Sequence, residues 1–146
     1  MTTNKIIITG GATRIGAAIA KSLADYETTI TIHYNKSKTK AFKLKNELEN
    51  LGSEVYLLKA DLNNFNQTQK LLPLAYKKMK GLNCLINNAS LFENDNLQNF
   101  TEKSFTKHFN INLKAPAILI QNFKKLLKNS EGNIINIIDQ RVEKLT

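Results

Sequence analysis

Short apolar runs alternate with longer segments of helical period along the whole chain, and this alternation is the feature that most limits its fold. The apolar runs lie at residues 5–9, 28–33, 54–59, 82–87 and 133–138. Apolar side chains recur at helical spacing in residues 14–24, 37–51, 66–80 and 101–128. Most of the runs are rich in Ile, Leu or Val with little alternation, as in strands covered on both faces. The pattern predicts an α/β fold: a Rossmann-like, doubly wound parallel sheet of about five strands.

Gly52 and Pro116 mark the ends or interruptions of helical segments. Gly52 follows the second helical segment and is expected to end that helix. Pro116 predicts a kink or a restart within residues 101–128. We find no linker, sequence repeat or low-complexity tract, so residues 1–146 are predicted to form a single domain.

The net charge of +9 raises the question of an acidic partner such as a nucleic acid or an anionic membrane. Only Arg14 and Arg141 among the 21 basic residues are arginines, and the lysines are scattered. There is also no aromatic strip on which bases could stack. The charge is therefore interpreted as a solvated, lysine-rich surface, and neither a nucleic-acid nor a membrane partner is expected.

Cys84 is the single cysteine, so an internal disulfide is excluded, and its apolar neighbours suggest a small buried side chain. The N-terminal residues 1–9 do not resemble a signal peptide, and no apolar run approaches membrane-spanning length. We expect a cytoplasmic protein without a metal site.

A glycine-containing segment, Thr9-Gly10-Gly11-Ala12-Thr13-Arg14-Ile15-Gly16, directly follows the first apolar run and opens the first helical segment. Glycines at 10 and 16 allow a tight turn and close packing of helix against strand. The backbone N–H groups at the helix start would then face a pyrophosphate. The alternative is an ordinary loop whose glycines serve turn geometry alone.

This segment resembles the cofactor fingerprint of the short-chain dehydrogenase/reductase family, and three further segments resemble that family in the same order. They are Asp61-Leu62, Asn87-Asn88-Ala89 and Asn112. The resemblance implies an oxidoreductase in which Asp61 and Leu62 contact the adenine ring. It also implies that Asn88 and Ala89 lie beside the cofactor and that Asn112 belongs to the active site.

The end of the second apolar run, His33-Tyr34-Asn35-Lys36-Ser37, carries no carboxylate. An acid at this place usually binds the ribose 2′-hydroxyl of NAD, whereas Lys36 and Ser37, with Arg14, could bind a 2′-phosphate. The predicted cofactor is therefore NADP(H); alternatively, Lys36 is a solvated lysine. The residues predicted to contact the cofactor are Gly10, Arg14, Ile15, Gly16, His33, Tyr34, Lys36, Ser37, Asp61, Leu62, Asn88, Ala89 and Ser90.

Asn88-Ala89-Ser90-Leu91-Phe92, together with Asp139 after the last apolar run, narrows the resemblance. These residues are similar to pteridine reductases and their bacterial dihydrofolate-reducing relatives. The resemblance implies hydride transfer to a pterin ring that stacks on Phe92 and contacts Ser90. Asp139 would help to protonate a ring nitrogen, and the catalytic residues would be Asp139 and Asn112. The alternatives are a core aromatic residue for Phe92 and a surface turn residue for Asp139.

Family members carry Tyr-x-x-x-Lys a short way beyond the position of Asp139, and the sequence given ends at Thr146. Tyr34 with Lys38 and Tyr76 with Lys80 have this spacing, but both pairs are expected to lie away from the nicotinamide. We therefore expect a chain that lacks the C-terminal elements of the family and is inactive alone. It would be a non-catalytic nucleotide-binding fragment or one half of a split enzyme. A complementing C-terminal fragment or a homo-oligomer is the expected protein partner.

Overall fold

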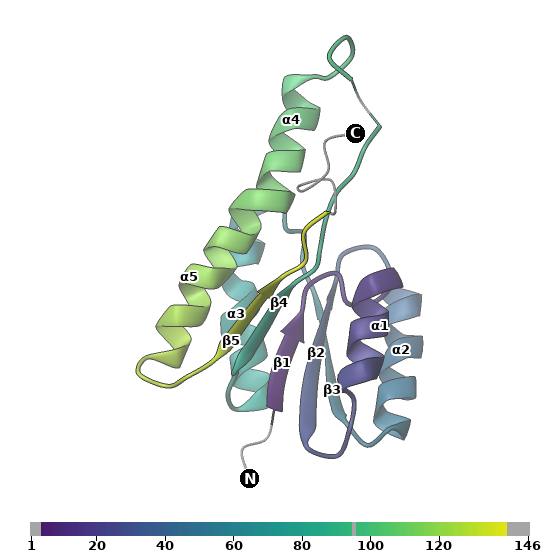
Figure 1. Cartoon of the computed structure of the whole chain (residues 1–146), viewed down its shortest axis with the longest axis vertical. Helices are drawn as coiled ribbons and strands as arrows, with labels where there is room; N and C mark the ends of the chain where they lie inside the picture. Colours follow the sequence, from purple (N-terminus) through teal and green to yellow (C-terminus); the bar gives the residue numbers. More distant parts are fainter. Residues whose placement is uncertain (1–3, 95, 140–146) are drawn as a thin grey trace.

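Five parallel strands form the centre of the computed structural model, which describes residues 4–94 and 96–139. The strands are β1 (Asn4–Ile8), β2 (Thr28–Tyr34), β3 (Glu54–Lys59), β4 (Cys84–Asn87) and β5 (Asn133–Asn136). Their order in the sheet is β3-β2-β1-β4-β5 (Figure 1). The order reverses between β1 and β4, the point at which open parallel sheets bind ligands. The predicted α/β fold is confirmed.

Helices cover both faces of the sheet (Figure 1). Helices α1 (Arg14–Leu23) and α2 (Lys38–Asn50) pack on one face, and α3 (Phe65–Met79) and α5 (Ala115–Leu127) pack on the other. Neighbouring residues of β1 show why the runs are apolar without alternation. Ile6 and Ile8 belong to the core under α1 and α2, whereas Ile7 belongs to the core under α3 and α5. Each of these three β1 residues therefore has an apolar environment on the face to which it points.

The last helical segment is one long rod made of three pieces (Figure 1). Helix α4 (Glu102–Phe109) continues through a π-helical turn, η1 (Asn110–Lys114), into α5. Pro116 lies in the first turn of α5, directly after the π turn, so the hydrogen-bond pattern changes next to the proline but the helix does not stop and restart there. The apolar spacing of residues 101–128 did not indicate the π turn.

The ends of the elements follow local chemistry. Gly52 has φ +101° after α2, as expected for a helix-ending glycine, and a Cβ there would meet the Tyr26 ring at 2.6 Å. Helix α3 begins at Phe65 because the Asn64 side chain accepts the Gln67 N–H. The last strand stops at Asn136, two residues earlier than the apolar run, and Ile134, Ile135 and Ile138 remain exposed beside this sheet edge.

Within residues 4–94 and 96–139, no helix has the length and apolar character needed to cross a membrane.

Candidate functional site

The loop between β1 and α1 runs along the carboxyl end of the sheet, and its glycines are sterically required. Gly10 has φ +59°, and a Cβ at this position would lie 2.9 Å from Ala89 Cα. A Cβ at Gly16 would lie 2.5 Å from the Gly10 carbonyl oxygen and 2.6 Å from Asn88 Nδ2. Any larger residue would push the first turn of α1 away from the loop. The glycines therefore hold a tight loop against the segment that follows β4, beyond the needs of an ordinary turn.

Thr9 and Asn88 tie this loop to the end of β4. The Thr9 hydroxyl oxygen accepts the N–H groups of Asn88 and Ala89, each at 3.0 Å. In return, Asn88 Nδ2 donates to the Thr9 and Gly10 carbonyl oxygens at 2.9 and 3.2 Å. The Asn88 side chain therefore holds the loop in place. This structural role is separate from the cofactor contact that was predicted for Asn88.

His33 fastens the other side of the loop from the end of β2. Its Nδ1 accepts the Gly10 N–H at 3.0 Å, and its Nε2 lies 3.1 Å from the Ala60 carbonyl oxygen. Because a carbonyl can only accept, the proton is on Nε2 and the imidazole is neutral. Burial lowers the pKa of His33 from 6.5 to about 4, outweighing the opposing effects of Ala60 and Asp61. The sequence predicted a cofactor contact at His33, but both ring nitrogens are occupied by backbone groups, so its side chain positions the loop.

Helix α1 starts with features suited to an anion. The Thr13 side chain makes no capping hydrogen bond, which leaves the first N–H groups of the helix without a side-chain acceptor. Arg14 is exposed with φ +52°, a left-handed conformation that is costly for a residue with a Cβ. Ile15 is 57% exposed at the same helix end. The positive end of the helix dipole and the Arg14 charge favour a phosphate group here.

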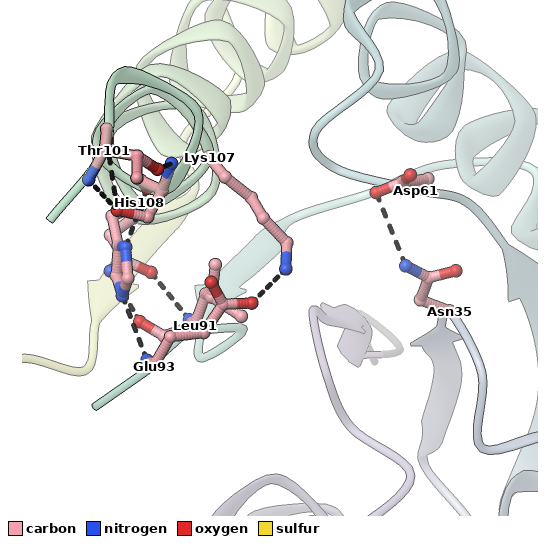
Figure 2. Close-up of polar contacts among 9 residues, drawn as sticks. Asn35, Asp61, Leu91, Glu93, Thr101, Lys107 and His108 are labelled. Carbon is pink, nitrogen blue, oxygen red and sulfur yellow. Dashed lines mark hydrogen bonds and ion pairs between the residues drawn. The ribbon is translucent and has the colours of Figure 1, made fainter. Parts of the chain in front are cut away.

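The ends of β2 and β3 provide the neighbouring surface. Lys36 is exposed and Ser37 is the N-cap residue of α2, without a side-chain capping bond. The Asp61 carboxylate accepts the Asn63 N–H at 3.0 Å and the Asn35 side-chain amide at 3.4 Å (Figure 2). The Tyr34 and Leu62 side chains are buried in the two cores, so any nucleotide contact at these two positions is with the backbone.

The segment after β4 leads from the loop to the predicted pterin side. Ser90 is exposed, and Phe92 is 79% exposed, which rules out a core aromatic role within the described chain. Asn112, in η1, exchanges two hydrogen bonds with the Leu91 backbone: its Oδ1 accepts the N–H at 2.8 Å and its Nδ2 donates to the carbonyl at 2.9 Å. The structure thus brings Asn112 next to Phe92 through the intervening backbone.

Asp139 is exposed and follows β5 at the same edge of the sheet as this segment. The adjoining strand ends are joined by the Asn87 side chain, which donates to Asn136 Oδ1 at 2.9 Å, and by the Ile137 N–H, which donates to the Asn87 carbonyl. By contrast, the Lys80 carbonyl accepts a hydrogen bond from the Lys5 side chain at the start of β1. The Tyr76 and Lys80 pair is therefore at the amino edge of the sheet, as expected.

Sequence reasoning missed two groups of residues at this edge. The Thr9 hydroxyl was part of the fingerprint but was given no role, because its partners are 79 and 80 residues away. Lys107 and His108 contact Glu93 near Phe92, and no motif marks them (Figure 2). Their only sequence signal is the four-residue spacing of His108 and Asn112, which puts both on one helix face.

Several known proteins are similar to this chain in sequence or in fold. The family model for the short chain dehydrogenases matches residues 4–141. A short-chain dehydrogenase/reductase of Pestalotiopsis microspora is 32% identical over 88% of this chain and 48% of its own length. The crystal structure of FolM alternative dihydrofolate reductase 1 from Brucella canis with NADP is 34% identical, with a TM-score of 0.89. It matches 99% of this chain over 59% of its own length.

A short chain dehydrogenase from Burkholderia cenocepacia, also crystallised with NADP, has a TM-score of 0.91 at 25% identity. It matches 99% of this chain and 59% of its own length, so this chain spans 48–59% of the length of these three relatives. The fingerprint loop, the parallel sheet with its order reversal, and the match over residues 4–141 lead to one conclusion: the chain belongs to the short-chain dehydrogenase family.

Proposed function

We propose that this chain is the nucleotide-binding part of an NADPH-dependent short-chain reductase that transfers a hydride to a pterin ring. The observation that carries the proposal is the glycine loop beside a β2 end that presents Lys36 and Ser37 and no carboxylate. Asp61, an acid that lies close to this end, is engaged by the Asn63 backbone and the Asn35 side chain.

Each part of NADP(H) would have its own set of residues at this edge of the sheet. Gly10 and Gly16 keep the loop tight against the segment after β4, and the N–H groups at the α1 N-terminus would bind the pyrophosphate. Arg14, Lys36 and Ser37 would hold the 2′-phosphate through charge-assisted contacts. Asp61 and the Leu62 backbone would border the adenine ring. Asn88, Ala89 and Ser90 would lie beside the nicotinamide ribose.

The pterin assignment rests on the exposed segment after β4. Phe92 would stack on the flat ring, Ser90 would contact both ring and cofactor, and Asp139 would pass a proton to a ring nitrogen through water. When bound, the cofactor supplies the hydride. Two similar structures, from Brucella canis and Brucella suis, are alternative dihydrofolate reductases with NADP, and this supports a pterin-type substrate.

Cofactor titration tests the first half of the proposal. The intact chain should bind NADPH more tightly than NADH, because only NADPH carries the 2′-phosphate. Lys36→Ala should weaken NADPH binding by about 1–3 kcal/mol, the range for one charge-assisted hydrogen bond, and leave NADH binding unchanged. Lys43→Ala, which removes another exposed lysine of α2, is the matched control. Equal affinity of the intact chain for both cofactors would rule out the 2′-phosphate site.

We further propose that additional polypeptide, in the same chain or in a second one, completes the active site. The exposed isoleucines at β5 and the span of the relatives beyond this chain support the proposal. In the family, Tyr-x-x-x-Lys supplies the acid and anchors the ribose, and general acid–base catalysis is worth about 10²–10⁴ in rate. The alternative is a nucleotide-binding module without catalysis.

Monitoring NADPH absorbance with dihydrobiopterin or dihydrofolate distinguishes these two alternatives. Residues 1–146 alone should oxidise NADPH at background rates, and turnover should appear when a segment carrying Tyr-x-x-x-Lys is added. Binding of NADPH without turnover in any combination would favour the non-catalytic module. Rapid turnover by residues 1–146 alone, abolished by Asp139→Ala, would contradict the need for completion.

A further inference from the structure

Residues 91–93 are attached at both ends to the long helical rod (Figure 2). At the inner end, Asn112 exchanges two hydrogen bonds with the Leu91 backbone. At the outer end, His108 Nε2 accepts the Glu93 N–H at 3.0 Å, and the Glu93 carboxylate forms an ion pair with Lys107. Phe92 lies between the two attachments and is 79% exposed. The position of Phe92 therefore depends on the contacts of its neighbours Leu91 and Glu93.

The protonation state of His108 follows from its two partners. Nδ1 lies 2.8 Å from the Ser104 carbonyl oxygen, which can only accept, so Nδ1 carries a proton. Nε2 faces the Glu93 N–H, which can only donate, so Nε2 must offer a lone pair. The contact with Glu93 thus exists only for the neutral imidazole.

The capped start of α4 fixes the position of His108. Thr101 and Ser104 form a reciprocal capping box at the beginning of α4, and the carbonyl of Ser104 holds the imidazole. His108 and Asn112 are four residues apart and lie on the same face of the rod. A well-capped helix start therefore transmits its position to the segment that carries Phe92.

We infer that His108 is a positioning residue for the substrate side of the site, because its neutral imidazole fixes the outer end of residues 91–93 and so the place of Phe92. That Phe92 borders a pterin rests on the proposed function; the positioning itself does not. Protonation of Nε2 would turn the acceptor into a donor facing the Glu93 N–H, and this attachment would open. Among the residues that the structure describes, the Glu93 carboxylate and the Lys107 ammonium stand at this attachment and pair with each other.

Two substitutions of His108 by amide residues test whether the hydrogen bond to the Glu93 N–H matters. His108→Gln can place an amide oxygen near the position of Nε2 and keep an acceptor for Glu93. His108→Asn is too short to reach Glu93 but can still donate to the Ser104 carbonyl. Amide hydrogen exchange at Glu93, followed by NMR, should accelerate about tenfold in H108N, as expected for losing one hydrogen bond, and little in H108Q.

A tryptophan introduced in place of Phe92 reports on the segment directly, because the chain contains no other tryptophan. In F92W, acidification should change the emission with the same midpoint as the His108 imidazole followed by NMR. The F92W/H108Q variant should lack that transition. Any change that the two proteins share is independent of His108. Thermal unfolding of each variant shows that the comparison is made between folded chains.

The outcomes keep this inference apart from the proposed function. A His108-dependent emission change in F92W supports the positioning role. Failure of dihydrobiopterin to quench the F92W emission would count against the pterin assignment and would leave the positioning role intact. Equal Glu93 exchange in folded H108N and H108Q, or an unchanged acid transition in F92W/H108Q, overturns the positioning role.

Discussion

Replacing His33 by asparagine should flatten the acid side of the stability curve of this chain. His33 is 2% exposed and neutral, and burial lowers its pKa from 6.5 to about 4. Between these two values the unfolded chain binds a proton at His33 and the folded chain does not. The stabilising effect is therefore fully present above about pH 6.5 and is lost as the pH falls through about 4.

The size of the effect follows from the same two values. Each pKa unit corresponds to about 1.4 kcal/mol, so the free energy of unfolding should fall by about 3 kcal/mol across this window. That is a large part of the roughly 5–15 kcal/mol that stabilises a typical domain. In His33→Asn the side chain does not titrate, and its Oδ1 can still accept the Gly10 N–H. The variant loses the contact with the Ala60 carbonyl, so it should be less stable at neutral pH by about 1–3 kcal/mol.

Urea unfolding between about pH 7 and about pH 4, followed by circular dichroism, measures the slope. The difference between the two proteins should shrink as the pH falls, because carboxylates titrate alike in both. Comparing the parent and His33→Asn in a His108→Gln background removes the other histidine from both proteins, so the difference in slope then belongs to His33. If the curves of the parent and His33→Asn run parallel through the whole window, the reasoning about His33 is wrong.

Three further changes probe the loop and the rod. Gly16→Ala should abolish NADPH binding and lower stability by roughly 1–3 kcal/mol, because its Cβ would lie 2.5 Å from the Gly10 carbonyl and push α1 away from the loop. Calorimetry measures both effects, and normal binding would contradict the requirement for a tight loop. Arg14→Gly should raise stability by up to about 1 kcal/mol by relieving the left-handed φ while reducing the preference for NADPH; a loss of stability on urea unfolding would contradict the strain. Phe105→Ser should weaken any self-association seen by sedimentation, because Phe105 and Phe109 form an exposed stack on α4; unchanged sedimentation would place the contact elsewhere.

The sheet and its helices could be predicted because their signal is local. Both neighbours of Ile7 in β1 are isoleucines that pack on the opposite face. Consecutive apolar residues therefore indicate directly that the strand is buried on both faces. The glycine loop was predictable for the same reason, since Gly10 and Gly16 belong to one short segment. The predicted β5 was too long by two residues, because β4 ends at Asn87. The Asn87 carbonyl accepts the Ile137 N–H, and Ile137 and Ile138 lie beyond the paired register although they are apolar.

What could not be predicted depends on contacts between distant segments. The motif placed His33 beside a cofactor, but its ring turns toward Gly10 and Ala60, which are 23 and 27 residues away. The attachment of Glu93 to His108 spans 15 residues and involves no recurring pattern. Side-chain direction decides such roles, and a sequence states only which residue occupies each position.

The fastening of the glycine loop also has a consequence for the order of folding. Thr9 depends on Asn88 and Ala89, so the loop cannot take its final shape until β4 has paired with β1 across nearly eighty residues. Contacts of such long sequence separation form slowly because the intervening chain must first be closed into a loop. The nucleotide site should thus be among the last parts to mature. A ligand that binds only the finished loop would trap the folded chain and slow its unfolding, so that cofactor supply would set the lifetime of the protein.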